Sequence, residues 1–341
     1  MNAAGNKKSF LLAAKAPLLG FAFLVVLLLP GVLIGFFLLS GAASILLFGA
    51  LPVAAAYFGG ATRTSAPIIA LMVLSGSLAR FFDQDPVPSA LLIAAVAFII
   101  GMSARRGLSS PILIVGISLG FLVISPPTLG QSGQQVISNI NPVLATAALL
   151  LIGGLWARLI IIGVQKWSPI TSETSRRTAD EFVPYALALA ISTGISTYFV
   201  LIYAPNGVGA WLILTIFVVL KMDTHHTVVK TRDRVLGTLS GAVVAFILIE
   251  LLQALNWAQG FVQLTLALVF IGVAMSYFVP GPYWKYVFFL TPGVVLLDSN
   301  AVSDQVTVDA WRVAFTLIGV AVALLTSLAV LEVRRVIRHR K

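Results

Sequence analysis

Residues 221–241 read KMDTHHTVVKTRDRVLGTLSG, and an apolar segment lies on each side of them. The first fourteen of these residues carry eight ionisable side chains, although charged residues make up only 10% of the chain. In a membrane protein, such a cluster is expected to face water, lipid headgroups or a permeating solute. The stretch therefore indicates a polar turn between two membrane-spanning helices.

The composition of the whole chain agrees with this interpretation. Hydrophobic residues make up 59% of the 341 residues, and the mean hydropathy is +1.02. Soluble domains contain about 45–50% apolar and about 25% charged residues. The sequence therefore predicts an all-α polytopic membrane protein. The net charge of +10 is then explained by orientation in the membrane, and we expect no nucleic-acid partner.

The number of helices follows from the length of the apolar segments, because a helix needs about 20 residues to cross a bilayer. Twelve such segments are predicted, at residues 18–40, 42–58, 65–81, 88–103, 111–126, 142–164, 183–203, 209–220, 235–254, 260–278, 284–298 and 310–332. With the N-terminus inside, the lysines and arginines of the loops fall on the cytoplasmic side. The predicted outer loops hold acidic residues, Asp83, Asp85 and Asp304. The positive-inside rule therefore predicts cytoplasmic termini, and we expect the bacterial inner membrane.

An internal repeat is also predicted. Sliding the chain by about 173 residues aligns VAFIIGMS at 96–103 with VFIGVAMS at 269–276, and other short segments align at the same offset. Six spans per half give two halves in the same orientation. We therefore expect a first six-helix half at 1–164, a cytoplasmic linker at 165–182 and a second six-helix half at 183–341.

The charged turn and the helix start after it carry a family resemblance. The pattern consists of an apolar span, a charged turn and then Thr227, Lys230, Arg234, Gly237, Thr238 and Gly241. It resembles the signature of fusaric-acid-resistance-like proteins, which belong to the aromatic acid exporter superfamily together with relatives such as plant aluminium-activated malate transporters. The resemblance implies export or permeation of organic, often aromatic, anions. The first half carries only a degenerate version, around Arg63.

The basic residues of this pattern are candidates for an anion path. A cytoplasmic vestibule lined by Arg63, Lys230, Arg232 and Arg234 would concentrate anions, because a basic cleft with low-dielectric walls focuses the field. Arginine also pairs bidentately with carboxylates. The alternative is ordinary anchoring to lipid phosphates at the cytoplasmic face. Gly237 and Gly241 form a G-x-x-x-G pattern that predicts close helix packing, with a lining role in the path as the alternative.

Two further segments are candidates for the substrate site. Thr291, Pro292 and Gly293 are expected to interrupt the eleventh span, and Ser118 and Gly120 take the matching place in the fifth. Interrupted spans at equivalent positions in two halves indicate a central site, where free backbone N–H groups receive an anion. The alternative is a simple proline kink.

Aromatic residues stand just before the eleventh span. Tyr283 is predicted to be an interfacial anchor, or else to stack on an aromatic substrate.

Three residues are candidates for proton coupling. Glu250 lies in the outer half of the ninth span, where a carboxylate needs a partner or water. The alternative for it is a structural salt bridge. His225 and His226 are candidates because imidazole is the side chain suited to proton transfer near neutral pH. Adjacent side chains on a helix point in different directions, so we expect at most one of them to act.

The remaining motifs exclude several classes of function. The chain has no cysteine, no H-E-x-x-H, no G-x-S-x-G and no Walker A motif, so we predict no enzyme, cofactor or metal site. Three hypotheses stay open. The first is a transporter that exports organic carboxylates, with or without proton coupling. The second is an uncoupled anion channel. The third is a non-transport subunit of a larger efflux assembly, with a periplasmic adaptor or further copies of the chain as partners.

Overall fold

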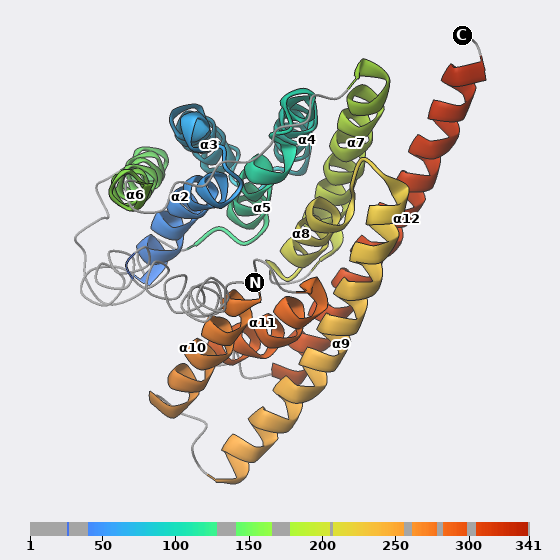
Figure 1. Ribbon diagram of the computed structural model, residues 1–341. Coiled ribbons are helices and arrows are strands. Elements are labelled where there is room, and N and C mark those ends of the chain that lie inside the picture. The colour runs from blue at the N-terminus through green and yellow to red at the C-terminus, as the bar shows by residue number, and fades with distance from the viewer. Residues whose placement is uncertain are drawn as a thin grey trace, which may run out of the picture. The chain divides into compact units, whose positions relative to one another are not determined.

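The computed structural model describes residue 26 and residues 40–127, 141–165, 178–204, 207–255, 261–277, 282–298 and 305–339. All regular structure in these residues is helical (Figure 1). The α-helices are α2 (Ser40–Phe58), α3 (Ser65–Phe82), α4 (Pro86–Ser103), α5 (Ser109–Ile124), α6 (Pro142–Gln165), α7 (Ala179–Tyr203), α8 (Ala210–Val219), α9 (Thr224–Ala254), α10 (Phe261–Ser276), α11 (Tyr283–Asp298) and α12 (Gln305–His339). Two 3₁₀ turns, Thr62–Thr64 and Ala104–Arg106, adjoin α3 and α4.

These helices lie at eleven of the predicted spans, and the predicted span 18–40 lies largely outside the described residues. Six segments are long and apolar enough to cross a bilayer, namely Thr62–Phe82, Pro86–Arg106, Pro142–Gln165, Glu181–Tyr203, Thr224–Ala254 and Ala310–Arg335. Shorter apolar helices lie within α2, α5, α8 and α10. The prediction of an all-helical membrane protein is confirmed. The count of twelve spans stays a prediction.

The chain divides into two compact units. The first unit comprises Met1–Val26 and Val228–Leu317, and the second comprises Leu27–Thr227 and Ile318–Lys341. Among the described residues, the first unit holds most of α9, all of α10 and α11, and the start of α12. The second holds α2 to α8 and the rest of α12. The two six-helix halves stay a prediction.

Helices of the second unit approach one another closely at glycines. A Cβ atom on Gly49 of α2 would lie 2.3 Å from the Leu150 carbonyl oxygen of α6. A Cβ atom on Gly153 of α6 would lie 2.1 Å from the Leu46 carbonyl oxygen of α2. The two helices are therefore antiparallel and in backbone contact. Lipid solvates apolar side chains as well as a neighbouring helix does, so the hydrophobic effect does not bring membrane helices together. Close packing of this kind stabilises their contact instead.

The start of α4 is fixed by a local cap. The side chain of Asp85 accepts a hydrogen bond from the Val87 N–H at 3.2 Å, and Pro86 occupies the first helical position. Both features are favoured at helix N-termini.

Replacing Asp85 with alanine is expected to lower the free energy of unfolding by about 1 kcal/mol, because the cap is lost. Unfolding in mixed detergent–dodecyl sulfate micelles measures this. Asp85→Asn, which keeps the acceptor oxygen, is the control and should stay close to the wild type. Equal losses in the two variants would contradict the capping role.

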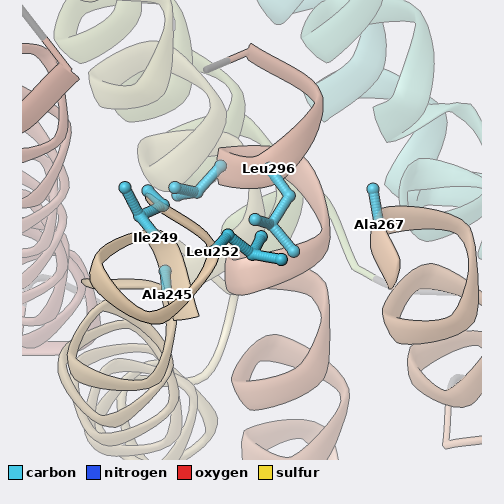
Figure 2. Packing of buried hydrophobic residues seen from close by; sticks show 6 residues of the cluster. Ala245, Ile249, Leu252, Ala267 and Leu296 are labelled. Atoms are coloured by element: carbon cyan, nitrogen blue, oxygen red, sulfur yellow. The ribbon is translucent and has the colours of Figure 1, made fainter. Parts of the chain in front are cut away.

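In the first unit, α9, α10 and α11 share a core (Figure 2). The buried cluster consists of Ala245, Ile249 and Leu252 from α9, Ala267 from α10, and Val295 and Leu296 from α11. Leu248, Leu266 and Phe270 pack against it. The α9 residues of the cluster recur every three or four positions, so they lie on one face of the helix.

The direction of α11 relative to α9 follows from pairs of contacts. A Cβ atom on Gly237 would lie 2.6 Å from Val287 Cβ, and one on Gly241 would lie 2.8 Å from Thr291 Cβ. Residue numbers rise together along the two helices, so α9 and α11 run in the same direction. In α10, the Gln263 side chain donates to the Leu296 carbonyl at 2.9 Å, so the start of α10 meets the end of α11.

Candidate functional site

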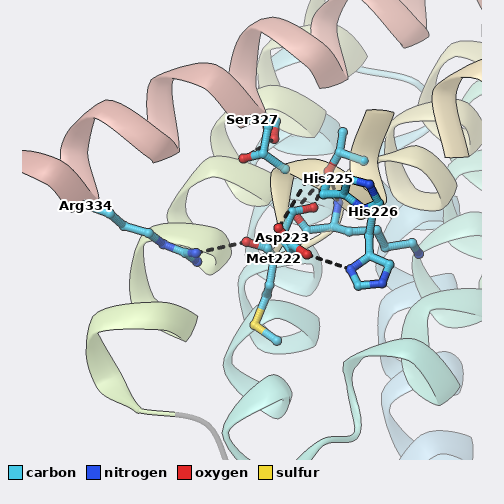
Figure 3. Close-up of polar contacts among 9 residues, drawn as sticks. Met222, Asp223, His225, His226, Ser327 and Arg334 are labelled. Atoms are coloured by element: carbon cyan, nitrogen blue, oxygen red, sulfur yellow. Dashed lines mark hydrogen bonds and ion pairs between the residues drawn. The ribbon is translucent and has the colours of Figure 1, made fainter. Parts of the chain in front are cut away.

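The turn before α9 is built by Thr227 and Asp223. The buried Thr227 hydroxyl accepts the Lys221 N–H at 3.0 Å and lies 3.2 Å from the Asp223 carbonyl oxygen. One carboxylate oxygen of Asp223 accepts the His225 N–H at 3.2 Å, and the other lies 2.8 Å from His226 Nδ1 (Figure 3). Across the described ranges of the chain, a carboxylate is in contact with the His226 ring but with no nitrogen of the His225 ring, and both rings are exposed. Proton coupling through the histidines stays a prediction.

An arginine near the end of α12 is hydrogen-bonded to the same turn, within the second unit. Arg334 donates from Nη1 to the Met222 carbonyl at 2.9 Å and from Nη2 to the Glu181 carbonyl at 2.5 Å. The Ser327 hydroxyl lies 3.3 Å from the Thr224 hydroxyl (Figure 3). The sequence predicted Arg334 only as one of the basic residues of a cytoplasmic terminus, because these contacts join positions more than a hundred residues apart.

Replacing Arg334 with glutamine is expected to speed amide hydrogen exchange at residues 222–227 about tenfold. Each of its hydrogen bonds to a backbone carbonyl is a charge-assisted bond worth about 1.5 kcal/mol or more. Mass spectrometry of the exchanged peptides measures the change. Arg335→Gln, which removes an exposed contact with Glu332, is the control and should leave these amides unchanged. Unchanged exchange in Arg334→Gln would contradict the tie.

The length of α9 places its charged start outside the hydrocarbon. Its 31 residues span about 46 Å at about 1.5 Å per residue, whereas the hydrocarbon core is about 30 Å thick. The apolar segment 235–254 accounts for that thickness. Residues 224–234 therefore extend to the membrane boundary, with Arg234 at the junction.

Two cations of α9 converge on one aromatic ring of α11, within the first unit. The Lys230 ammonium lies 3.9 Å from the centroid of the Tyr283 ring, and the Arg234 side chain lies close to the Tyr283 phenol. Lys230 and Arg234 are four residues apart, which brings both to the same side of the helix. Burial raises the pKa of the Tyr283 phenol, and the neighbouring Arg234 only partly opposes this. Tyr283, which precedes the predicted span 284–298, is therefore a neutral phenol at neutral pH.

Arg232 and Arg234 differ sharply in their surroundings. The Arg232 side chain is 72% exposed and lies 3.6 Å from the Asp233 carboxylate. Arg234 is only 4% exposed, and its Nε has no hydrogen-bond partner among the residues that the structure describes. From the sequence alone, these two arginines belong to one basic group. They point to different sides of α9: Arg234 lies seven residues before Gly241, which places it on the same face as that glycine, the face that packs against α11.

Two threonine hydroxyls close to Arg234 in the sequence also lack a hydrogen-bond partner among the described residues. Within the described part of the chain, Thr231 Oγ1 and Thr238 Oγ1 are buried without a hydrogen-bond partner. Positions 231, 234 and 238 lie three and four residues apart, so the three groups share one face of α9. Buried polar groups are nearly always satisfied by protein, water or a ligand, so three unsatisfied donors in two turns mark a polar site.

The packing glycines lie at a helix contact. A Cβ atom on Gly237 would lie 2.7 Å from the Trp284 carbonyl oxygen, and one on Gly241 would lie 2.7 Å from the Phe288 carbonyl oxygen. These contacts fit the packing interpretation of the G-x-x-x-G pattern. They also bring the face that carries Arg234 against α11.

The expected interruption of the eleventh span is not present. α11 is one continuous helix from Tyr283 to Asp298 through Pro292. Proline removes the N–H that would bond the Phe288 carbonyl four residues earlier, but this one loss does not end the helix. The Thr291 hydroxyl donates to the Val287 carbonyl at 2.9 Å.

The matching residues of the fifth span also lie in a continuous helix, α5. Ser118 is buried, and a Cβ atom on Gly120 would lie 3.0 Å from Ile213 of α8. A Cβ atom on Gly293 would lie 2.8 Å from Ile271 of α10. These glycines therefore lie at helix contacts, and a substrate role for them stays a prediction.

Two other candidates lie away from Arg234. Arg63 is exposed in the 3₁₀ turn Thr62–Thr64 of the second unit. Glu250 is exposed on α9, next to the buried Ile249 of the shared core, so its side chain points away from α10 and α11. Their roles in the anion path and in proton coupling stay predictions.

Comparison with known proteins places the Arg234 site inside a recognised segment. No curated protein and no solved structure matched the chain. A family model described as fusaric acid resistance protein-like matches residues 189–326. This match extends from α7 into α12 and includes Thr231, Arg234, Thr238 and Tyr283. Over this part, somewhat less than half of its length, the chain is similar to fusaric acid resistance proteins.

Proposed function

We propose that this protein exports organic carboxylate anions across the bacterial inner membrane. The observation that carries the proposal is Arg234, a buried guanidinium at the membrane boundary of α9 whose Nε has no hydrogen-bond partner among the described residues. The match of residues 189–326 to fusaric acid resistance proteins supports a membrane transport or resistance role.

The chemistry of Arg234 favours an anionic substrate. A buried cation is costly unless it is paired, and guanidinium pairs preferentially with carboxylate or phosphate groups. Lys230 lies four residues before Arg234 on the same side of α9 and adds a second positive charge. A positive field at the cytoplasmic end of a helix attracts anions from the cytoplasm, which is the side from which an exporter loads.

The energy source is proposed to be the proton gradient or the membrane potential. The chain has no Walker A motif for ATP hydrolysis. Glu250 and one of the two histidines, His225 or His226, are the groups that proton coupling would use, since a carboxylate within a span and an imidazole are the side chains suited to carrying protons.

Flux in proteoliposomes tests the proposal. The purified protein is reconstituted and loaded with benzoate, salicylate, hexanoate or malate, and efflux is followed with and without a pH gradient. Carboxylate efflux above that of protein-free liposomes supports export. Acceleration by the gradient supports proton coupling, and flux that ignores the gradient, with unitary currents, identifies an anion channel instead. No movement of any carboxylate in either condition would overturn the proposal.

A further inference from the structure

We infer that Arg234 and Thr238 form a binding site for one carboxylate group, with Thr231 at its edge and Tyr283 as the residue that positions the guanidinium. This inference rests on the proposed function, because it assigns the place where the exported anion is held. It can nevertheless be tested by binding alone, without transport.

The donors of the site match a carboxylate in number and in charge. An ionised carboxylate is an acceptor only, with two oxygens that each take two hydrogen bonds. Arg234 Nε and Thr238 Oγ1, four residues apart on one face of α9, offer two donors, and neither has a partner among the described residues. Thr231 Oγ1 lies one turn before Arg234 on the same face and is likewise without a partner there. A water molecule would satisfy some of these groups but would leave the arginine charge unpaired.

Tyr283 fixes how the guanidinium is presented. Its phenol lies close to the Arg234 side chain, and its ring face is covered by the Lys230 ammonium at 3.9 Å. A side chain of α11 thus restrains the guanidinium, whereas Nε has no partner among the described residues. Guanidinium groups are strong carboxylate ligands because their donors lie in a rigid plane, so holding that plane prepares the site.

The surroundings favour a singly charged ligand over a doubly charged one. Asp233 is 8% exposed and follows directly after the exposed Arg232, which lies 3.6 Å from it. A buried carboxylate next to the site repels further negative charge, and the cost of removing an anion from water rises steeply with its charge. We therefore expect carboxylates to bind more tightly than phosphonates that carry the same organic group.

Equilibrium titration calorimetry on the full chain in detergent micelles tests the site. The probes are benzoate, benzamide and phenylphosphonate, which share a ring, and hexanoate, which has none. Wild-type protein is expected to bind benzoate and hexanoate with similar affinity, phenylphosphonate about tenfold more weakly, and benzamide not detectably, because a neutral amide cannot pair with the cation.

The variants separate the site from general electrostatics. Arg234→Lys keeps the charge but loses the Nε donor, and should weaken benzoate binding about tenfold or more. Thr238→Val is nearly isosteric and should weaken it about fivefold through one lost hydrogen bond. Tyr283→Phe keeps the ring and should weaken it about threefold, with Arg234 no longer positioned. The matched control Arg232→Gln removes an exposed charge and should stay within about twofold of the wild type.

The outcomes separate the proposed binding site from the proposed export function. Equal binding of benzamide, no binding of benzoate to folded wild type, or equal effects of Arg232→Gln and Arg234→Lys would overturn the site. Should Arg234→Lys fail to fold, wild-type affinity in Thr231→Val and Thr238→Val would overturn it as well. Binding without flux would leave the site standing and overturn export. Flux that is unchanged in folded Arg234→Lys and Thr238→Val would leave export standing and overturn the site.

Discussion

Replacing Arg234 with glutamine is expected to reduce carboxylate flux in proteoliposomes about tenfold or more. The lost interaction is a charge-assisted hydrogen bond between guanidinium and carboxylate, which is among the strongest single contacts in proteins. Arg234 is 4% exposed, so water cannot replace it as readily as it replaces a surface arginine. The rate of benzoate efflux, divided by the amount of reconstituted protein, measures the effect.

Folding should survive this change. Neutralising a buried charge removes a desolvation cost. Arg232→Gln makes the same change of charge two residues away, at a side chain that is 72% exposed, and its flux should be near that of the wild type. Wild-type flux in a well-folded Arg234→Gln protein would instead assign Arg234 to anchoring at the membrane boundary.

The second large effect is expected at Gly241, where valine should lower the free energy of unfolding by about 3 kcal/mol or more. Its Cβ atom would lie 2.7 Å from the Phe288 carbonyl oxygen and 2.8 Å from Thr291 Cβ. A backbone carbonyl cannot rotate away as a flexible side chain can. α9 and α11 must therefore separate, which also breaks the contacts of Arg234 with Tyr283. Unfolding in dodecyl sulfate mixtures, followed by tryptophan fluorescence, measures the loss.

Gly163 provides the control for this substitution. It lies in α6, and outside the backbone of that helix no described residue is within 4 Å of the position that a Cβ atom would take. Gly163→Val makes the same change of residue without a helix contact, and helix propensity slightly favours valine over glycine, so its effect should stay below about 1 kcal/mol. Similar losses at positions 163 and 241 would show that the contact with α11 does not explain the result.

Most of the helical framework could be predicted from the sequence. Apolar length alone placed helices at eleven segments, because each bilayer-spanning helix must satisfy its backbone internally. The start of α9 was less clear, since the predicted span began at residue 235 and the helix begins at Thr224. The signal for the earlier start is Asp223, an acidic residue placed to accept the N–H of the first turn.

The candidate site was predicted only in part. From the sequence alone, Arg234 belongs with Lys230 and Arg232 to one basic group. The one sequence signal that distinguishes the buried Arg234 from the exposed Arg232 is its position on the same helical face as Gly241. Tyr283 was predicted as an interfacial anchor or a stacking platform. Its contact with Arg234 joins residues 49 positions apart in the chain, and the local pattern gives no sign of such a pairing. The break predicted at Pro292 was wrong, because a single missing N–H does not end a helix in a packed environment.

The proline in α11 and the glycine in α9 meet at the same backbone oxygen. Pro292 has no N–H to donate to the Phe288 carbonyl four residues earlier, so this oxygen lacks its usual helical partner. A Cβ atom on Gly241 would lie 2.7 Å from the same oxygen, so α9 has no room for a side chain there. The missing hydrogen bond and a close approach of the two helices therefore coincide, and a substitution at either position changes the surroundings of one carbonyl group.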